Sequence, residues 1–476
     1  MAGSNPPPPP PPAAAAATSQ PLTDSALQQP PPTLTSPSQP DLIESSAGPD
    51  QPPSVVDIKD LLRRLWPAPT TAASSSSPAV SPTEISDAIA HFFTDRIDDV
   101  QTGALLMCLH FTGLDRDPAV LSLCARKMLQ AAAQVDSSLL ARVIQERGHK
   151  EGNYHGGFCD IVGTGGDAHN TFNISTTASI LASSLLLVAK HGNRASTSKS
   201  GSADLIANMA FPRPPAMAAV EPQHIARIYT ATNYAFLFAP SFHPGMRFVS
   251  PVRRKLPWRT IFNLLGPLAN PMDVHDQPML EARVIGVARR DLGPVFAEAL
   301  RMNGVRKAMV VCGEEDLDEV SCAGPTLCWR LVENPATKQV DIDHFRLTPE
   351  DFGLARHPLA TVSPGKEPAQ NAAILKRILT NELDASEPLV EFVLLNTAAL
   401  LVVSGVCDAD ASDMGRGDDG AVLTETGPGG GRWKEGVRRA RWAMTSGEAW
   451  RQWNAFVDVT NGIQDAQNEK STTTTV

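Results

Sequence analysis

Two short segments in the first half of the chain combine glycine with hydroxyl, amide and charged side chains. The segment 163–167 (Gly-Thr-Gly-Gly-Asp) follows the apolar run 158–162, and the segment 190–198 (Lys-His-Gly-Asn-Arg-Ala-Ser-Thr-Ser) follows the apolar run 186–189. Each run has the length of a strand, and an apolar helix-like segment joins the two units. Glycine-rich loops after parallel strands offer free backbone N–H groups to phosphates. The pattern therefore predicts two loops that face a ligand with several phosphates.

The first loop adds an acidic side chain and leads into a helix. Asp167 could hold a metal ion or a ribose hydroxyl, although Gly-Gly-Asp is also a common turn. Asn173, Ser175 and Thr176 open the apolar helix, where amide, hydroxyl and free N–H groups suit a phosphate. Asn173 or Ser175 would also serve as the N-cap, and the two roles are compatible.

The second loop begins at Lys190, which offers positive charge at the end of a strand. Its hydroxyls come from Ser196, Thr197, Ser198 and Ser202. Neither loop has the G-x-x-x-x-G-K-[ST] order of a Walker A motif or the G-x-G-x-x-G order of a dinucleotide fingerprint. The predicted phosphate site is of another type.

Two further segments could complete such a site. Asp318 and Glu319 follow the strand-like run 308–313, and adjacent carboxylates suit Mg²⁺ that bridges phosphates. Such a pair is more often an exposed acidic turn, but the phosphate loops favour a metal here. The block 238–271 places His243 and Arg253 among proline, glycine and aromatic residues, and arginine can bind a planar carboxylate through two hydrogen bonds. Taken alone, surface arginines and a structural histidine explain this block better.

Composition narrows the class of protein. The 476 residues are 42% hydrophobic, which is enough for one large or two modest domains, and the net charge of -10 without a basic stripe disfavours nucleic-acid binding. The seven cysteines show no C-x-x-C pair, so we expect a reducing, cytoplasmic location without disulfides or zinc. No apolar run is long enough to span a membrane.

The spacing of apolar residues predicts an α/β protein with a small all-helical N-terminal domain and a larger domain with a mostly parallel central sheet flanked by helices. Ser81, Pro82 and Glu84 look like a capping box that begins one of the N-terminal helices. The predicted parts are a disordered Pro/Ala-rich tail (1–55), a helical domain (56–135) on which a helical segment (about 211–235) packs, an α/β domain (150–463) with a flexible insertion (408–431), and a disordered C-terminal tail (464–476).

The motifs together resemble the anthranilate phosphoribosyltransferase family over roughly residues 81–463. The resemblance rests on 163–167, 173–176, 190–204, the 243–271 block and 317–319, which occur in the family's order and spacing. It implies transfer of phosphoribose from phosphoribosyl pyrophosphate (PRPP) to the amino group of anthranilate in tryptophan biosynthesis. It also implies Mg²⁺, the nucleoside phosphorylase/phosphoribosyltransferase type of fold and a homodimer. The elongated tail and insertions are typical of a fungal member.

The resemblance also assigns residues. PRPP would contact Gly163, Gly166, Asp167, Thr171, Asn173, Ser175, Thr176, Lys190, His191, Gly192, Asn193, Arg194, Ala195, Ser196, Thr197, Ser198 and Ser202. Anthranilate would contact Gly163, Asn193, His243 and Arg253, and Mg²⁺ would contact Ser175, Asp318 and Glu319. No residue is assigned as a general base.

Two other functions fit parts of the pattern. A pyrimidine nucleoside phosphorylase of related architecture would use phosphate as co-substrate, but the intact segment 190–194 and Arg253 favour anthranilate. A catalytically inactive relative that binds nucleic acid is disfavoured by the acidic charge and the complete carboxylate pair.

Overall fold

The computed structural model describes residues 56–66, 79–195, 199–274, 277–362 and 367–473. The predicted N-terminal tail and the predicted PRPP contacts Ser196, Thr197 and Ser198 lie outside the described residues. Within the described ranges, no helix is both long and apolar enough to cross a membrane.

The first described part of the chain is helical. Its helices are α1 (Ile58–Leu65), α2 (Pro82–Ala90), α3 (Asp99–Thr112) and α4 (Pro118–Gln130). Ser81 caps α2 as predicted, because its Oγ accepts a hydrogen bond from the Glu84 N–H at 3.2 Å. The predicted capping box is incomplete, since the Glu84 carboxylate binds the guanidinium of Arg64 on α1. That ion pair joins the first two helices instead.

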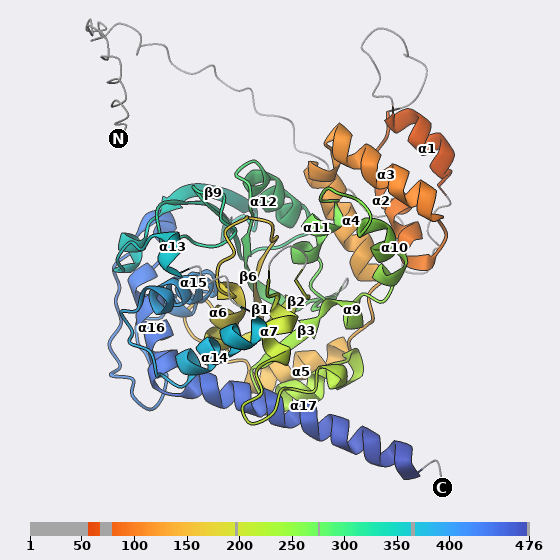
Figure 1. The fold of residues 1–476 in the computed structure, drawn as a ribbon. Coiled ribbons are helices and arrows are strands. Elements are labelled where there is room, and N and C mark those ends of the chain that lie inside the picture. The colour runs from red at the N-terminus through yellow and green to blue at the C-terminus, as the bar shows by residue number, and fades with distance from the viewer. Residues whose placement is uncertain (1–55, 67–78, 196–198, 275–276, 363–366, 474–476) are drawn as a thin grey trace, which may run out of the picture. The chain divides into compact units, whose positions relative to one another are not determined.

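A seven-stranded sheet with the order β3-β2-β1-β6-β7-β8-β9 forms the centre of the following α/β part (Figure 1). The strands β1 (Phe158–Gly163), β2 (Leu187–Gly192), β3 (Tyr234–Phe238), β6 (Leu280–Gly286) and β7 (Ala308–Gly313) are parallel, and β8 (Thr326–Glu333) and β9 (Val340–Leu347) are antiparallel. A separate antiparallel pair consists of β4 (Asp273–Val274) and β5 (Gln277–Pro278). The predicted mostly parallel sheet is confirmed.

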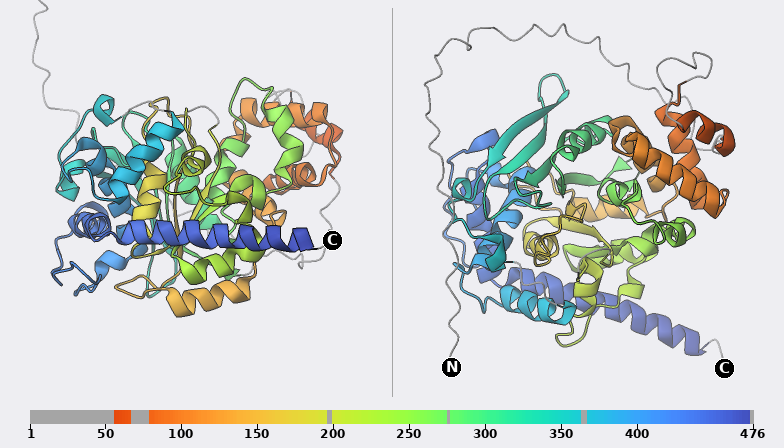
Figure 2. Two further views of the ribbon diagram at one scale, coloured as in Figure 1. Left: turned by 60° about the horizontal axis from the view of Figure 1, so that its bottom comes forward. Right: turned by 45° about the horizontal axis from the view of Figure 1, so that its top comes forward.

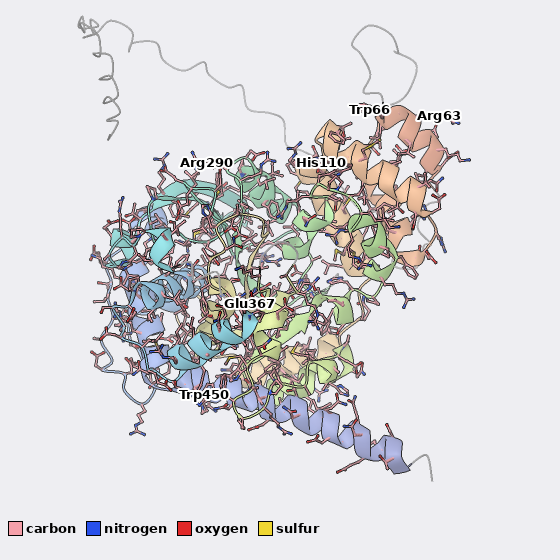
Figure 3. All side chains as sticks on the ribbon, in the orientation of Figure 1. Arg63, Trp66, His110, Arg290, Glu367 and Trp450 are labelled. Carbon is pink, nitrogen blue, oxygen red and sulfur yellow. The ribbon has the colours of Figure 1, made fainter. Side chains whose placement is uncertain are left out.

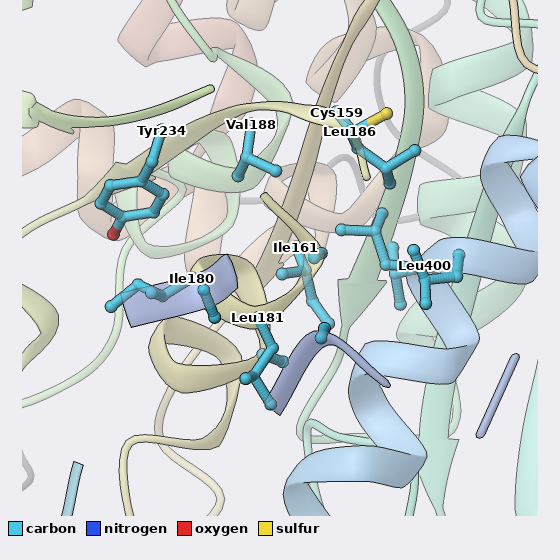
Figure 4. Close-up of a cluster of buried hydrophobic side chains, with 14 of the residues drawn as sticks. Cys159, Ile161, Ile180, Leu181, Leu186, Val188, Tyr234 and Leu400 are labelled. Atoms are coloured by element: carbon cyan, nitrogen blue, oxygen red, sulfur yellow. The ribbon is translucent and has the colours of Figure 1, made fainter. Parts of the chain in front are cut away.

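Helices cover the sheet on both faces, as the continuous apolar strands require. The helices with bounds are α5 (Ser137–Arg147), α6 (Ile174–Ala182), α7 (Ser202–Ala207), α8 (Ile225–Ala231), α9 (Ala239–Phe242), α10 (Met246–Arg253), α11 (Phe262–Leu265), α12 (Leu292–Met302), α13 (Leu359–Val362), α14 (Pro368–Leu379), α15 (Pro388–Ser404), α16 (Trp433–Thr445) and α17 (Glu448–Thr473). On one face, Leu181 of α6 and Leu400 of α15 pack with Ile161 of β1 (Figure 4). On the other face, Phe296 of α12 belongs to a hydrophobic core that extends to Leu121 of α4.

The segment 211–235 does not pack on the N-terminal helices, so that prediction is wrong. Its helix α8 packs against α5 and α17, with Ile228 and Tyr229 fully buried. The reason is chain length: α8 ends at Ala231 and β3 begins at Tyr234, so the helix must stay beside its strand. The elements that pack on the N-terminal helices include α10, which contacts α3, and α11 and α12, which contact α4.

Two other predictions about the C-terminal part need correction. The sequence predicts a disordered tail from residue 464, but the helix α17 continues to Thr473 (Figure 2). Residues 464–470 extend the helix because they include good helix formers and no glycine or proline. The insertion 408–431 has little regular structure, yet Asp418 anchors it. Its carboxylate accepts hydrogen bonds from Ser412 Oγ (2.8 Å), the Met414 N–H (2.9 Å) and Arg438 Nη1 of α16 (3.0 Å).

Candidate active site

The carboxyl ends of β1 and β2 lie side by side and bring the two glycine-containing loops to one edge of the sheet. β1 also pairs in parallel with β6, whose last residue Gly286 lies opposite Gly163. In open α/β sheets, ligands bind at this edge, just beyond the carboxyl ends of the strands. The fold therefore positions both loops where their sequence pattern predicts a ligand.

The first loop depends on two glycines for its shape. Gly165 and Gly166 have φ values of +66° and +83°. Residues other than glycine adopt such values only with backbone strain. A Cβ atom on Gly166 would overlap the guanidinium of Arg259, and a Cβ atom on Gly163 would overlap the carboxylate of Asp318. The loop is thus in close contact with two charged side chains from distant parts of the chain.

Three carboxylates meet beside this loop. Asp318 Oδ2 accepts a hydrogen bond from the Gly165 N–H at 2.5 Å, and Glu319 Oε2 accepts one from Thr171 Oγ1 at 3.3 Å. Burial and the charge of Asp167 raise the pKa of Asp318 to about 7. Burial, and then repulsion from Asp318 and Asp167, raises the pKa of Glu319 well above its usual value. Burial and mutual repulsion therefore disfavour full ionisation of this cluster.

Oxygen donors of this kind fit a hard divalent cation. In the described residues, no group of three or more His, Cys, Asp or Glu side chains has the arrangement of a complete metal site. A cation held here would consequently need further oxygen ligands from Ser175 and from a bound phosphate. Such a cation would offset the repulsion between the carboxylates, which contributes to their raised pKa values.

The start of α6 connects the two loops. Asn173 occupies its N-cap position without a side-chain capping bond. Its amide instead donates to the Ser200 carbonyl at 2.8 Å and accepts from Ser200 Oγ and Asn371 Nδ2, both at 3.1 Å. Thr176 Oγ1 donates to Ser202 Oγ at 2.8 Å. The predicted residues Asn173, Thr176 and Ser202 therefore lie close together. Hydrogen bonds between the start of α6 and the end of the second loop orient their polar groups.

Lys190 is buried inside β2, which continues to Gly192, and its Nζ donates to the Ile161 carbonyl at 2.7 Å. Burial lowers the pKa of Lys190, while attraction to Asp160, Glu319 and Asp318 opposes that shift. The second loop continues beyond Lys190 and is held by a residue that the sequence analysis did not single out. Asp204 accepts hydrogen bonds from the Ala195 N–H (2.9 Å) and the Gly201 N–H (3.1 Å).

The two histidines near the site lie close together and are both buried. His191 and His243 have ring centroids 5.2 Å apart, and each ring contacts a backbone carbonyl, of Gly266 (3.3 Å) and Ala269 (3.0 Å) respectively. Burial lowers the pKa of His191 well below 6.5 and that of His243 to about 4. Both rings are therefore neutral near pH 7, and each donates its single N–H to the neighbouring carbonyl.

Arg253 lies at the end of α10 with its guanidinium 5.3 Å from the centre of the Phe262 ring. Burial, and then repulsion from Arg259, lowers the pKa of Arg253 to about 10. The repelling Arg259 itself contacts the first loop, where its Nη2 donates to the Thr164 carbonyl at 2.7 Å. The structure describes no direct contact of Arg253 with Gly163 or Asn193, the other predicted anthranilate contacts.

Residues beyond the predicted set also organise the site, namely Arg259, Asp204 and Asn371. Asp204 sits three residues after Gly201 at the start of α7, a capping position that the sequence could have revealed. Arg259 lies within the arginine-containing block 238–271, but nothing in its spacing distinguishes it from a surface arginine. Asn371 comes from α14, almost 200 residues from Asn173, and carries no local signal.

The chain matches the family described as "Glycosyl transferase family, a/b domain" over residues 155–450 and "Glycosyl transferase family, helical bundle domain" over residues 59–132. The anthranilate phosphoribosyltransferase of Schizosaccharomyces pombe is 36% identical over 380 residues, which cover 80% of this chain and 92% of the relative. The Saccharomyces cerevisiae enzyme is 31% identical over 406 residues, which cover 82% and 96%.

Solved structures agree with this match. The structure of anthranilate phosphoribosyltransferase from Saccharomyces cerevisiae in complex with PRPP and Mg has a TM-score of 0.67 at 29% identity, and the alignment covers 85% of this chain and 98% of that one. The enzyme from Thermus thermophilus has a TM-score of 0.63 at 31% identity, covering 81% and 97%. This chain belongs to the anthranilate phosphoribosyltransferase family.

Proposed function

We propose that this chain transfers the phosphoribosyl group of PRPP to the amino group of anthranilate, as a cytoplasmic enzyme of tryptophan biosynthesis. The observation that carries the proposal is the close contact of the 163–167 loop with Asp318, which joins a phosphate-binding loop to a carboxylate pair. The relatives named above have the same activity in their names, and one was solved with PRPP and Mg.

The phosphate groups of PRPP fit the edge of the sheet between the two loops. The N–H groups of the 163–167 loop and of the start of α6, with the hydroxyls of Thr176 and Ser202, would bind them. Lys190 adds positive charge from β2, where its Nζ contacts the Ile161 carbonyl of β1. Ser175, Asp318 and Glu319 would hold Mg²⁺, which when bound neutralises the charge of the departing pyrophosphate.

Anthranilate would lie on the other side of the first loop. Arg253 is suited to its carboxylate, because the guanidinium is partly buried and the described residues pair it with no acid. Gly163, Asn193 and His243 would surround the ring. In the reaction, the amine nitrogen forms a bond to the anomeric carbon as the bond from that carbon to the pyrophosphate oxygen breaks, and the amine proton passes to solvent water. The residues act by alignment and charge neutralisation.

The deciding experiment mixes the purified chain with anthranilate, PRPP and Mg²⁺ and follows the loss of anthranilate fluorescence. We expect the loss to require all three components. A parallel assay with thymidine and phosphate tests for a phosphorylase. Nucleobase release there, without loss of anthranilate fluorescence, would overturn the proposed function.

We also propose a homodimer, supported by exposed apolar side chains on the N-terminal helices. Val100, Met107 and Phe111 follow one stripe of α3 and are 81%, 37% and 61% exposed, and Trp66 at the end of α1 is also exposed (Figure 3). Light scattering should give the dimer mass for the wild type and the monomer mass for Phe111→Asp. Leu139→Asp, which changes an exposed leucine on α5, is the matched control.

The cysteines support the cytoplasmic location. All seven are free and buried. Buried thiols that form no disulfide are typical of a reducing compartment.

A further inference from the structure

Arg259 stands out because its guanidinium lies against the backbone of the first loop. It belongs to the connection between α10 and α11, and its Nη2 donates to the Thr164 carbonyl at 2.7 Å. Its Nη1 occupies the space that a side chain at Gly166 would need. One guanidinium therefore spans the loop from residue 164 to residue 166, at the carboxyl end of β1.

The charge of Arg259 is only partly compensated. Burial lowers the pKa of Arg259, and the carboxylates Asp318 and Asp167 oppose that shift from a distance. Among the ion pairs of the described residues, however, none joins Arg259 to a carboxylate. A guanidinium has five N–H donors, and the described hydrogen bonds of Arg259 use one of its nitrogens, Nη2.

The guanidinium of Arg253 adds a second positive charge near Arg259. Arg259 lowers the pKa of Arg253 by repulsion, so the two positive charges are close enough to affect each other. The described ion pairs include none for Arg253 either. Two partly buried arginines that repel each other are stabilised when bound ligands supply negative charge.

We propose that Arg259 binds the pyrophosphate group of PRPP, as a second substrate-binding arginine beside Arg253. The inference rests on the proposed function and extends it to a residue outside the predicted contacts. Arg253 lies over the Phe262 ring and is proposed above for the anthranilate carboxylate, whereas Arg259 lies on the loop that contacts Asp318. The loop and the carboxylate pair belong to the pyrophosphate end of the site. The two arginines then divide the two acidic substrates between them.

The test uses the full chain and inorganic pyrophosphate with Mg²⁺ as the probe. Calorimetry gives the Kd of pyrophosphate, and product inhibition gives its Ki, for the wild type, Arg259→Gln and Arg259→Lys. Loss of a charge-assisted, two-pronged contact should raise both constants about 10- to 100-fold in Arg259→Gln and less in Arg259→Lys. The KM for anthranilate should stay within about twofold. Arg254→Gln, the exposed neighbour of Arg253, is the matched control and should behave as the wild type.

The outcomes separate this inference from the proposed function. If the wild type turns over anthranilate but Arg259→Gln and Arg254→Gln bind pyrophosphate equally well, the inference is wrong and the function stands. A rise in the anthranilate KM with unchanged pyrophosphate binding would also overturn it, since Arg259 would then serve the carboxylate. If the wild type has no transferase activity but binds pyrophosphate in an Arg259-dependent way, the inference stands and the proposed function is wrong.

Discussion

Gly163 and Asp318 are packed so tightly that the glycine has no room for a side chain. A Cβ atom at position 163 would overlap Asp318 Oδ2 and lie 3.2 Å from the Asp318 carbonyl oxygen. The same carboxylate oxygen accepts the Gly165 N–H at 2.5 Å. The end of β1 and the loop after β7 therefore hold each other in position, and they carry the residues proposed for PRPP and Mg²⁺.

This contact predicts a large effect of one methyl group. Gly163→Ala should push Asp318 away from the first loop and lower kcat/KM at least about 100-fold, which corresponds to about 3 kcal/mol of transition-state stabilisation. Steady-state kinetics measure it. Gly324→Ala, at a glycine with open space around its Cβ position, is the control and should keep normal kinetics. Normal activity of Gly163→Ala would show that the contact is not needed in the working enzyme.

The carboxylate pair predicts opposite effects on stability and activity. In Asp318→Asn with Glu319→Gln, activity should fall at least about 100-fold. The metal-free variant should nevertheless unfold at a higher temperature than the wild type at pH 8, because the repelling charges are gone. Mg²⁺ with pyrophosphate should raise the melting temperature of the wild type and of the control but not that of the double variant. Asp316→Asn, at a neighbouring exposed acid, is the control. Equal stabilisation of all three proteins by Mg²⁺ would exclude the pair as its site.

Local sequence patterns predict which loops meet at this edge of the sheet better than they predict the contacts between distant segments. The loops follow apolar strands, and parallel strands place their carboxyl ends at one edge, so the meeting of the 163–167 and 190–195 segments follows from local patterns. The bond from Gly165 to Asp318 spans 153 residues. Only the family resemblance could connect those two, because no local pattern encodes a contact across several intervening strands.

Helix packing was harder to predict than the mostly parallel sheet. The apolar residues of 225–229 indicate a helix but not its partner, and the two-residue connection to β3 decides that partner. Likewise, composition gave no signal for Arg259, since an arginine that lies on a glycine loop has the same sequence neighbourhood as one in solvent. Residues such as Asn371 act through the fold alone.

Arg253 predicts a selective loss of anthranilate binding. Arg253→Ala should raise the KM for anthranilate about 10- to 100-fold and change the KM for PRPP by less than about threefold, because a bidentate carboxylate contact would be lost. Arg253→Lys should recover only part of the affinity, since an ammonium cannot form two parallel hydrogen bonds. An unchanged KM for anthranilate together with lost PRPP binding would mean that the two arginines have been assigned to the wrong substrates.

His243 predicts a dependence of stability on pH. Its pKa is about 4 in the folded chain and about 6.5 when unfolded, so the unfolded state binds more protons between these values. The stability that the neutral ring contributes is complete above about pH 6.5 and is lost as the pH falls toward 4. His243→Gln keeps an N–H donor for the Ala269 carbonyl and removes this proton uptake.

Denaturant unfolding at pH 7 and pH 4.5 measures the effect of His243. Between these two conditions, the wild type should lose about 2–3 kcal/mol more stability than His243→Gln. His149→Gln is a suitable comparison, because its ring is half-exposed and hydrogen bonding to Glu151 raises its pKa instead. Parallel losses in the wild type and His243→Gln would show that the ring is already protonated in the folded protein.

Asp204 lies outside the proposed substrate contacts, and we expect it to hold the second loop in its conformation. Its carboxylate accepts the N–H groups of Ala195 and Gly201, which stand on either side of the loop's hydroxyl residues. Asp204→Ala should release both N–H groups, speed hydrogen exchange at these two positions and raise the KM for PRPP about 10-fold, while kcat changes less. Asn208→Ala, one turn further along the chain, loses only a bond to the Asp204 carbonyl and serves as the control. Faster exchange with an unchanged KM for PRPP would mean that the loop does not need its shape to bind PRPP. Slow exchange in Asp204→Ala would mean that other contacts hold the loop in place.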